Sequence, residues 1–321
     1  MTKSAGDCWV ITDAAAGNQR QALALAEMLE LPVRHLQLEP RAPWSWLSPR
    51  LAAGARLALT ETQRRQFASP WPTVAIGCGR QAAMYTRLLR RLSEGRCYTV
   101  QILDPRIDPA HWDLVIAPRH DHLVGPNVVQ TLGSLNPVDD RWLQDGRDAD
   151  PGLARLPGPR VGVLLGGPRR GVQFDEDYIA HLADRLLARQ QSEGGSLLAL
   201  ASRRTPRPLL ERLRERLAGA PGLVWGSQDD GGNPYPSVLG WADRLVVTPD
   251  SVNMLSEACA VGCPVHTLVL GTLPEKLARF HQALLEAGRL HDIEDVVTTP
   301  TEPLRETAAI AAMLRERLVA R

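Results

Sequence analysis

Three segments in the second half of the chain carry residues that could bind a diphosphate together. They are GGPRRG (166–171), SRRTP (202–206) and TPDSVNM (248–254), and each directly follows a short apolar run. Glycines allow backbone N–H groups to approach an anion closely, and arginines present planar donors to phosphate oxygens. Each segment alone has a simpler interpretation, as a tight turn or a solvent-facing pair of arginines. Their shared position after strand-like runs favours one common anion site.

The last of these segments continues into a helix-like stretch that could add a ribose contact. Ser251 is a residue type that caps helices, and a helix N-terminus favours a phosphate group. Glu257 follows about two turns along the predicted helix, among residues that are otherwise small or apolar. A diphosphate at the helix N-terminus would place an attached ribose near Glu257, whose carboxylate can accept hydrogen bonds from two hydroxyls. The simpler interpretation is an exposed helical glutamate.

The first half of the chain has its own polar residues after apolar runs. Asp13, Asp104, His120 and Asp121 follow three of these runs, and each is a type that serves as an acid or a base. Turn or cap residues are the simpler interpretation of all four. The tripeptide HDH (120–122) has metal-ligand side chains, but no second group of ligands accompanies it at a suitable spacing. We therefore expect no metal ion and no other cofactor.

Short apolar runs alternate with longer amphipathic stretches along the whole chain. Apolar runs too short for a helix are typical of buried strands, so the alternation predicts an α/β fold with parallel sheets covered by helices. In such sheets ligands bind beyond the carboxyl ends of the strands. The predicted strands are 8–12, 32–38, 73–77, 98–103, 113–117, 160–167, 196–202, 223–226, 244–248 and 264–270. The predicted helices are 18–30, 80–93, 175–191, 206–218, 251–261 and 274–287.

The two series of elements are separated by QDGRDADPGLARLPGPR (144–160), whose Gly, Pro and Asp content is typical of a linker. We therefore predict two Rossmann-like domains that face each other across a cleft. They are an acceptor domain at 1–150 and a nucleotide-sugar-binding domain at 151–300. A C-terminal helix at 301–321 is predicted to cross back and pack on the first domain.

Composition restricts the possible partners and the location. The 321 residues include 37 basic and 36 acidic side chains, a balance that gives no electrostatic reason to expect nucleic acid. The five cysteines form no metal-binding pattern and predict free thiols in a reducing compartment. No apolar run is long enough for a signal peptide or a spanning helix. We expect a cytosolic protein, or a peripheral one on the cytoplasmic face of a membrane.

One stretch could make that membrane contact. PWSWLSPRLAAGARLAL (43–59) places two tryptophans and several leucines and alanines beside two arginines. The simpler interpretation is a helix in the core or between domains. The alternative is interfacial contact with a membrane or with a lipid-linked acceptor.

The chain resembles, nearly end to end, the bacterial members of the mitochondrial fission (elongated mitochondria) family. The stretches that carry the resemblance include AGNQRQALALAE, VQILDPR, APRHDHLVGPNVVQTLGSLN and NPYPSVLGWADRLVVTPDSVNMLSEACAVGCPV. The family is similar to two-domain proteins of the glycosyltransferase B fold, and its members are also labelled nucleoside-diphosphate-sugar epimerases. In that fold the second domain holds a nucleotide-sugar and the first holds the acceptor.

The resemblance implies phosphate contact at Ser251 and ribose contact at Glu257. The predicted donor site comprises Gly166, Gly167, Ser202, Arg203, Arg204, Thr205, Asn233, Tyr235, Asp250, Ser251, Met254 and Glu257. The predicted acceptor or cleft residues are Gly17, Asn18, Gln21, Gly79, Arg80, Asp104 and Asn127.

The leading hypothesis is a metal-independent glycosyltransferase that uses a nucleotide-sugar and acts on a lipid-linked or glycolipid acceptor. Asp121, with His120 beside it, is the predicted base, and Asp13 is a further catalytic candidate. Two alternatives stay open. One is a nucleotide-sugar 2-epimerase, and the other is a non-catalytic scaffold that interacts with a membrane or with other proteins.

Overall fold

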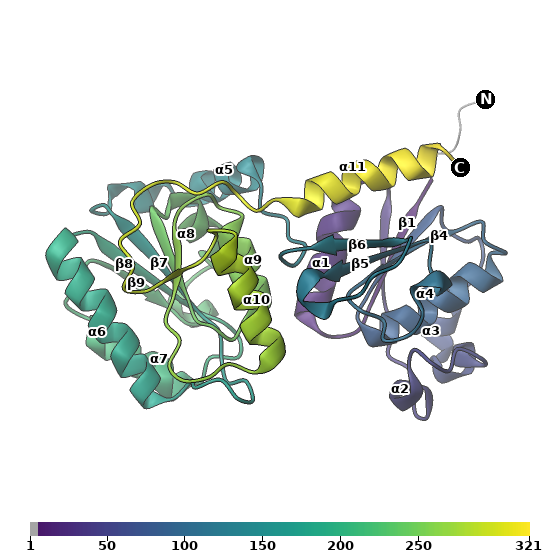
Figure 1. The fold of residues 1–321 in the computed structure, drawn as a ribbon, viewed down its shortest axis with the longest axis horizontal. Coiled ribbons are helices and arrows are strands. Elements are labelled where there is room, and N and C mark those ends of the chain that lie inside the picture. The colour runs from purple at the N-terminus through teal and green to yellow at the C-terminus, as the bar shows by residue number, and fades with distance from the viewer. Residues whose placement is uncertain (1–5) are drawn as a thin grey trace. The chain divides into compact units, whose positions relative to one another are not determined.

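The computed structural model describes residues 6–321, which form two compact units, each built on a six-stranded parallel sheet (Figure 1). Unit 1 contains the chain up to Pro137 together with Glu306–Arg321. Unit 2 is the continuous segment Val138–Arg305. In both sheets every strand pair is parallel, so all carboxyl ends of one sheet lie along one edge.

Unit 1 has the strand order β2-β1-β3-β4-β5-β6. Its strands are β1 (Cys8–Thr12), β2 (Val33–Gln37), β3 (Val74–Cys78), β4 (Tyr98–Ile102), β5 (Leu114–Pro118) and β6 (Val128–Thr131). Its helices are α1 (Ala16–Glu27), α2 (Trp44–Leu47), α3 (Glu61–Gln66), α4 (Arg80–Leu92) and α11 (Glu306–Val319). Short 3₁₀ turns lie at Ala55–Ala58, Pro109–His111 and Arg119–Asp121.

Unit 2 has the order β12-β11-β10-β7-β8-β9. Its strands are β7 (Arg160–Leu165), β8 (Ser196–Ala201), β9 (Gly222–Trp225), β10 (Arg244–Val247), β11 (Val265–Thr267) and β12 (His291–Asp292). Its helices are α5 (Asp140–Ala149), α6 (Glu176–Glu193), α7 (Arg207–Leu217), α8 (Tyr235–Trp241), α9 (Val252–Cys259) and α10 (Glu275–Glu286). Short 3₁₀ turns lie at Pro151–Arg155 and Gln228–Asp230.

The strand order defines one switch point in each sheet, where successive connections run in opposite directions. In unit 2 the chain passes from β7 out to β8 and β9, and then returns to the other side of β7 at β10. This is the order of dinucleotide-binding Rossmann sheets, whereas the order in unit 1 begins like that of flavodoxin. The switch points therefore lie between β7 and β10 in unit 2 and between β1 and β3 in unit 1. Ligands are expected at the carboxyl ends of these strands.

The central strands are buried on both faces because helices cover both sides of each sheet. All residues of β1, β3, β4, β5, β8 and β10 are buried, which explains why these runs are mostly apolar. By contrast, four of the five residues of β2 are exposed because β2 is an edge strand. The five cysteines are free, and burial raises the pKa of Cys8 and of Cys259 to about 12, which leaves both thiols protonated at neutral pH.

The segment predicted as a linker at 144–160 belongs to unit 2 and is mostly ordered as α5 and a 3₁₀ turn. Gly146 lets α5 approach α8 closely, since a Cβ atom there would lie 2.4 Å from the carbonyl oxygen of Pro236. The Arg147 guanidinium donates to the carbonyl oxygen of Gly240 over 2.9 Å. The glycine therefore serves helix packing, and the division between the units falls earlier than the predicted residue 150.

Helix α11 returns to unit 1 and packs against α1 (Figure 1). The Glu306 carboxylate accepts hydrogen bonds from the N–H groups of Leu132, at 2.9 and 3.0 Å, and Gly133, at 2.9 Å. Thr307 exchanges two hydrogen bonds with the backbone of Asn136. Apolar side chains of α11, Ile310, Ala311 and Leu314, complete the core over α1.

Within residues 6–321, no helix combines the length and apolar character that crossing a membrane requires. The stretch 43–59 does not form one helix. It forms α2 and the 3₁₀ turn Ala55–Ala58, with Pro49 between them, a residue that has no N–H to continue a helix.

Candidate functional site

The switch point of unit 2 is organised around the buried carboxylate of Asp250. Asp250 is 1% exposed and follows β10. The N–H of Gly167 donates to Asp250 Oδ2 over 3.0 Å, and the hydroxyl of Thr248 donates to Oδ1 over 2.7 Å. Thr248 Oγ1 in turn accepts from the N–H of Gly166 over 2.8 Å. The side chains of Thr248 and Asp250, which follow β10, therefore join the carboxyl end of β10 to that of β7.

The roles expected for the two glycines need correction. The sequence predicts that their N–H groups contact an anion, but both already donate to Thr248 and Asp250. A Cβ atom on Gly166 would lie 2.1 Å from Asp250 Oδ1, and one on Gly167 would lie 2.3 Å from the carbonyl oxygen of Arg204. The pair is glycine because the strand ends pack without room for a side chain.

Replacing Gly167 with Ala is therefore expected to lower the free energy of unfolding by about 2 kcal/mol, because the added methyl group displaces backbone rather than a flexible side chain. A urea titration of the unfolding of the whole chain measures this change. Gly219→Ala is the matched control, since a Cβ atom at that position would have no neighbour within 4 Å. An equal response of the two variants would contradict the packing explanation.

The segment after β8 is tied to the same point. The hydroxyls of Ser202 and Thr205 donate to the carbonyl oxygen of Gly166 over 2.8 and 2.5 Å. The Arg204 guanidinium donates to Asp250 Oδ2 over 2.6 Å, and its side chain stays 49% exposed while the carboxylate is fully buried. Three strand ends that are distant in sequence thus converge, as predicted from their common position.

Two arginines flank the N-terminus of α9. Arg169 donates to the carbonyl oxygen of Asp250 over 2.8 Å, and Arg204 contacts the carboxylate of the same residue. Ser251 caps α9, with its hydroxyl oxygen accepting from the N–H of Met254 at 3.4 Å. Arg203 is exposed and makes no hydrogen bond or ion pair within the described chain. The two flanking arginines outnumber the one carboxylate between them, and the helix N-terminus adds partial positive charge, so this edge can hold an anion.

Glu257 is buried rather than exposed, at 2% of its surface. The Tyr235 hydroxyl, from the first turn of α8, donates to Glu257 Oε2. Asn233 precedes α8 and accepts the N–H of Tyr235 at its Oδ1 over 3.1 Å. Helices α8 and α9 therefore bring together three predicted donor-site residues, Asn233, Tyr235 and Glu257. Glu257 lies more than one turn along α9 from Ser251.

In unit 1, Asp13, Asn18 and Gly79 lie together at the switch point. The Asn18 amide donates to both oxygens of the Asp13 carboxylate, at 3.0 and 3.2 Å. A Cβ atom on Gly79, which has a φ of +87°, would lie 2.4 Å from Asn18 Nδ2. Gln21 is buried on α1 and its side chain donates to the carbonyl oxygen of Gly17. These residues form the carboxyl edge between β1 and β3.

His120 and Asp121 lie elsewhere on the same edge, in the 3₁₀ turn after β5. His120 Nε2 and Asp121 Oδ1 are 3.9 Å apart, and their side chains are 4% and 5% exposed. In the sheet, β4 separates β5 from β3, so this pair follows a strand that does not border the switch point. The structure therefore brings His120 to Asp121, but it places the pair two strands along the edge from the switch point that Asp13 borders.

The remaining predicted residues have local partners. Asp104 accepts the N–H of Arg106 over 2.7 Å, as a turn residue does. Asn127 donates to the carbonyl oxygens of Pro109 and Trp112 and fixes the loop before β5. Arg80 reaches the carbonyl oxygen of Ser45 over 3.4 Å.

Two residues of the unit 2 site are absent from the predicted set. Thr248 lies inside one of the three predicted segments, and its position directly after a strand is a sequence signal that could have identified it. His281 on α10 is buried, and its Nε2 lies 2.9 Å from the carbonyl oxygen of Pro249. Burial lowers the pKa of His281, so the ring supports the turn as a neutral side chain. Nothing in the local sequence connects it with a turn 32 residues earlier. Among residues 6–321, no three His, Cys, Asp or Glu side chains gather as metal ligands would.

Two Rossmann-like units with these strand orders define the glycosyltransferase B fold. The solved UDP-GlcNAc 2-epimerase from Methanocaldococcus jannaschii is similar, with a TM-score of 0.59 and 11% identity over 97% of this chain and 99% of that one. So is UGT2 from Phytolacca americana, complexed with UDP-2-fluoro-glucose and pterostilbene, with a TM-score of 0.51 and 13% identity over 100% of this chain and 94% of that one. At these identities the similarity concerns the fold.

The chain belongs to the mitochondrial fission ELM1 family, whose family model matches residues 16–318. The mitochondrial fission protein ELM1 of Arabidopsis thaliana is 31% identical over 289 residues. The match covers 80% of this chain and 66% of the plant protein, just under two thirds of its length.

Proposed function

We propose that the protein is a metal-independent glycosyltransferase whose donor is a nucleotide-activated sugar. The observation that carries this proposal is the convergence of three strand ends, two arginines and a capped helix N-terminus on the switch point of unit 2. The similarity in fold to a plant protein complexed with a UDP-sugar supports a nucleotide-sugar as the class of ligand.

In the proposed complex the diphosphate lies at the N-terminus of α9. The Arg204 guanidinium contacts the Asp250 carboxylate, and about half of the side chain is exposed. Its remaining N–H groups can therefore donate to a phosphate oxygen. Arg203, which is exposed and has no partner among the described residues, can add a second guanidinium. Glu257 accepts the ribose hydroxyls, either in place of the Tyr235 hydroxyl or beside it.

The reaction we propose is a group transfer at the anomeric carbon of the sugar. The oxygen of an acceptor hydroxyl forms a bond to that carbon, and the bond from the carbon to the diphosphate oxygen breaks. The leaving nucleoside diphosphate takes the electron pair, and the arginines and the N–H groups of α9 stabilise its charge. The proton of the acceptor hydroxyl passes to Asp121, whose neighbour His120 is the second titratable group of the pair.

We further propose a lipid-linked or glycolipid acceptor and peripheral contact with a membrane. The support is an exposed apolar group around α2, in which Trp46 is 75% exposed, Leu57 67% and Leu47 46%. Other residues of the same stretch, such as Ala52 and Ala55, are buried and anchor it to unit 1. Exposed tryptophan and leucine side chains of this kind can enter the interface of a bilayer.

Replacing Asp121 with Asn tests the proposed chemistry. We expect the variant to bind a nucleotide-sugar as the wild type does, while acceptor-dependent release of nucleoside diphosphate falls by about 10²–10⁴-fold, because the base is lost. Release is measured with a coupled nucleotide assay and binding by calorimetry. Asp108→Asn is the matched control, since Asp108 also accepts a turn N–H in unit 1 and lies outside the predicted site.

The same preparation separates the alternatives. Exchange of a sugar ring proton with solvent, without any acceptor, identifies a 2-epimerase instead of a transferase. Absence of binding to every nucleoside diphosphate and nucleotide-sugar in a thermal-shift screen leaves the non-catalytic scaffold and excludes both enzymes.

A further inference from the structure

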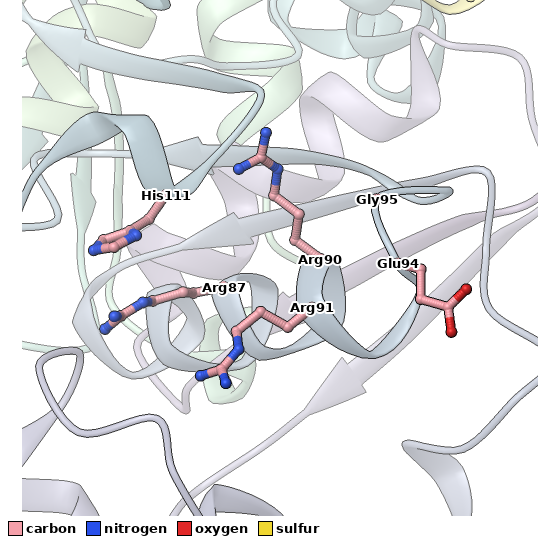
Figure 2. Close-up of a pocket in the computed structure, with 6 residues that line it drawn as sticks. All are labelled: Arg87, Arg90, Arg91, Glu94, Gly95 and His111. Atoms are coloured by element: carbon pink, nitrogen blue, oxygen red, sulfur yellow. The ribbon is translucent and has the colours of Figure 1, made fainter.

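A basic hollow lies in unit 1, away from the predicted donor and acceptor residues. Its volume is about 530 Å³. It is lined by Arg87, Arg90, Arg91, Glu94, Gly95 and His111 (Figure 2). The three arginines come from the second half of α4, and His111 comes from the 3₁₀ turn before β5. We call these six residues the basic hollow.

Arg90 and Glu94 each have a partner of opposite charge nearby, Arg90 in a partly buried pair and Glu94 at the surface. The Arg90 guanidinium donates to the Asp113 carboxylate over 3.2 Å and to the carbonyl oxygen of Ala110. Glu94 lies 3.9 Å from the Arg96 guanidinium, and Figure 2 shows its carboxylate pointing away from the side chains of Arg87 and His111. Neither side chain therefore contributes an unbalanced charge to the hollow.

Two positive charges remain. Arg87 donates to the carbonyl oxygens of Pro49 and Arg50, which are neutral groups that orient the guanidinium without balancing its charge. Arg91 is exposed, and its guanidinium forms no hydrogen bond or ion pair with any part of the chain that the structure describes. The partial negative charge at a helix C-terminus stabilises cations mainly in the last turn. It therefore does not balance the charge of Arg87, which lies further back on α4.

The two arginines also repel each other. Arg87 and Arg91 are four residues apart on α4, a spacing at which like charges destabilise a helix. Burial and the charge of Arg91 lower the pKa of Arg87, and burial followed by the charge of Arg87 lowers the pKa of His111. Burial is the larger cause of both shifts, and the smaller one is the positive charge of a neighbouring arginine, which a bound anion would offset.

The chain topology separates this hollow from the predicted site of unit 1. Helix α4 begins after β3 at the carboxyl edge of the sheet and runs back to the start of β4. Its last residues, and Asp113 immediately before β5, therefore lie at the amino edge. Asp13, Asn18 and Gly79 lie at the carboxyl edge. The hollow is a second place on the same unit.

We propose that the basic hollow is a binding site for a phosphate monoester. A phosphate monoester carries close to two negative charges at neutral pH, which matches the charges of Arg87 and Arg91. Guanidinium groups bind phosphate oxygens through paired N–H donors, and the neutral His111 ring can add one more hydrogen bond. A soluble phosphate ester and a lipid headgroup present the same chemistry.

Two probes with the same phosphate group test the site. They are glycerol 3-phosphate in solution and vesicles of phosphatidylcholine with and without phosphatidic acid. Arg91→Gln is the first variant because Arg91 is exposed and supports no other residue. It is expected to weaken binding about ten-fold, equivalent to about 1.4 kcal/mol, and Arg91→Glu is expected to abolish it. Arg65→Gln, on a side chain that is 78% exposed on α3, is the matched control and is expected to bind like the wild type.

Calorimetry and vesicle sedimentation then give decisive outcomes. Loss of glycerol 3-phosphate binding in the Arg91 variants supports a soluble ester, and loss that appears only on phosphatidic acid vesicles supports a headgroup. Equal binding by Arg91→Glu and the wild type in both arms overturns the proposal, as does absence of wild-type binding. A loss that follows Arg204→Gln but neither Arg91 variant would assign the phosphate to unit 2 and overturn it as well.

Discussion

Replacing Asp250 with Asn is expected to lower the free energy of unfolding by about 3 kcal/mol and to abolish nucleotide binding. The carboxylate accepts from Gly167, Thr248 and Arg204 while fully buried. An amide keeps one acceptor oxygen and turns an NH₂ group toward the remaining donors. Hydrogen bonds to charged groups contribute about 1.5–3 kcal/mol each, and removing one partner of a buried ion pair costs about 3–5 kcal/mol. Because about half of the Arg204 side chain is exposed, its guanidinium can be solvated by water when the carboxylate is lost. The expected loss of unfolding free energy is therefore at the lower end of that range.

Amide hydrogen exchange gives the local measurement. The N–H of Gly167 loses its charged acceptor, so its exchange is expected to accelerate by more than about ten-fold, equivalent to at least about 1.4 kcal/mol. Amides of unit 1 strands such as β3 serve as internal controls. Arg204→Gln, which removes the exposed partner and leaves the connection between the ends of β7 and β10 through Thr248 intact, is expected to cost less stability. A smaller effect for Asp250→Asn than for Arg204→Gln would contradict this account of the site.

Replacing Glu257 with Gln is expected to raise the Kd for a nucleoside diphosphate by about 10–100-fold. The reason is the loss of a charged acceptor for the ribose hydroxyls, worth about 1.5–3 kcal/mol for each hydrogen bond. Calorimetry with the diphosphate and its 2′-deoxy analogue makes the test specific for the ribose. The wild type is expected to distinguish the two ligands, and Glu257→Gln is expected to bind them alike.

Tyr235→Phe is the matched control for that experiment. It removes the hydroxyl that donates to Glu257 Oε2 and keeps the carboxylate. The folded protein is expected to lose about 1–3 kcal/mol, because a buried acceptor loses a donor. Discrimination against the 2′-deoxy ligand is expected to persist. If Glu257→Gln still discriminates as the wild type does, the ribose lies elsewhere.

The central strands could be predicted because the sequence pattern and the burial have the same cause. A strand covered by helices on both faces is mostly apolar, so β1, β8 and β10 are visible as short apolar runs. Edge strands lack this constraint. Only one of the four residues of β6 is buried, and β12 has two residues, so neither leaves a run that can be recognised.

The convergence of the three polar segments could be predicted for a similar reason, since parallel strands place their carboxyl ends along one edge. The sequence could not predict which residues of these segments contact one another across that edge. Asp250 was expected to contact a ligand, but it holds the backbone of Gly167, and the glycines are needed for packing. The bond between Tyr235 and Glu257 joins residues 22 apart in sequence, and only the packing of α8 beside α9 brings them together. Composition also misled at α5, where Gly146 fits a helix contact rather than a flexible linker.

The return of α11 sets an order on biosynthesis. The carboxylate that binds the N–H of Leu132 comes from a residue 174 positions later in the chain. A ribosome therefore completes all of unit 2 before it delivers the last helix of unit 1. Until then the surface of α1 that will contact Ile310 and Leu314 is open to water or to a chaperone. The unit that begins first finishes last, and a nascent chain stalled before α11 carries a complete unit 2 and an incomplete unit 1.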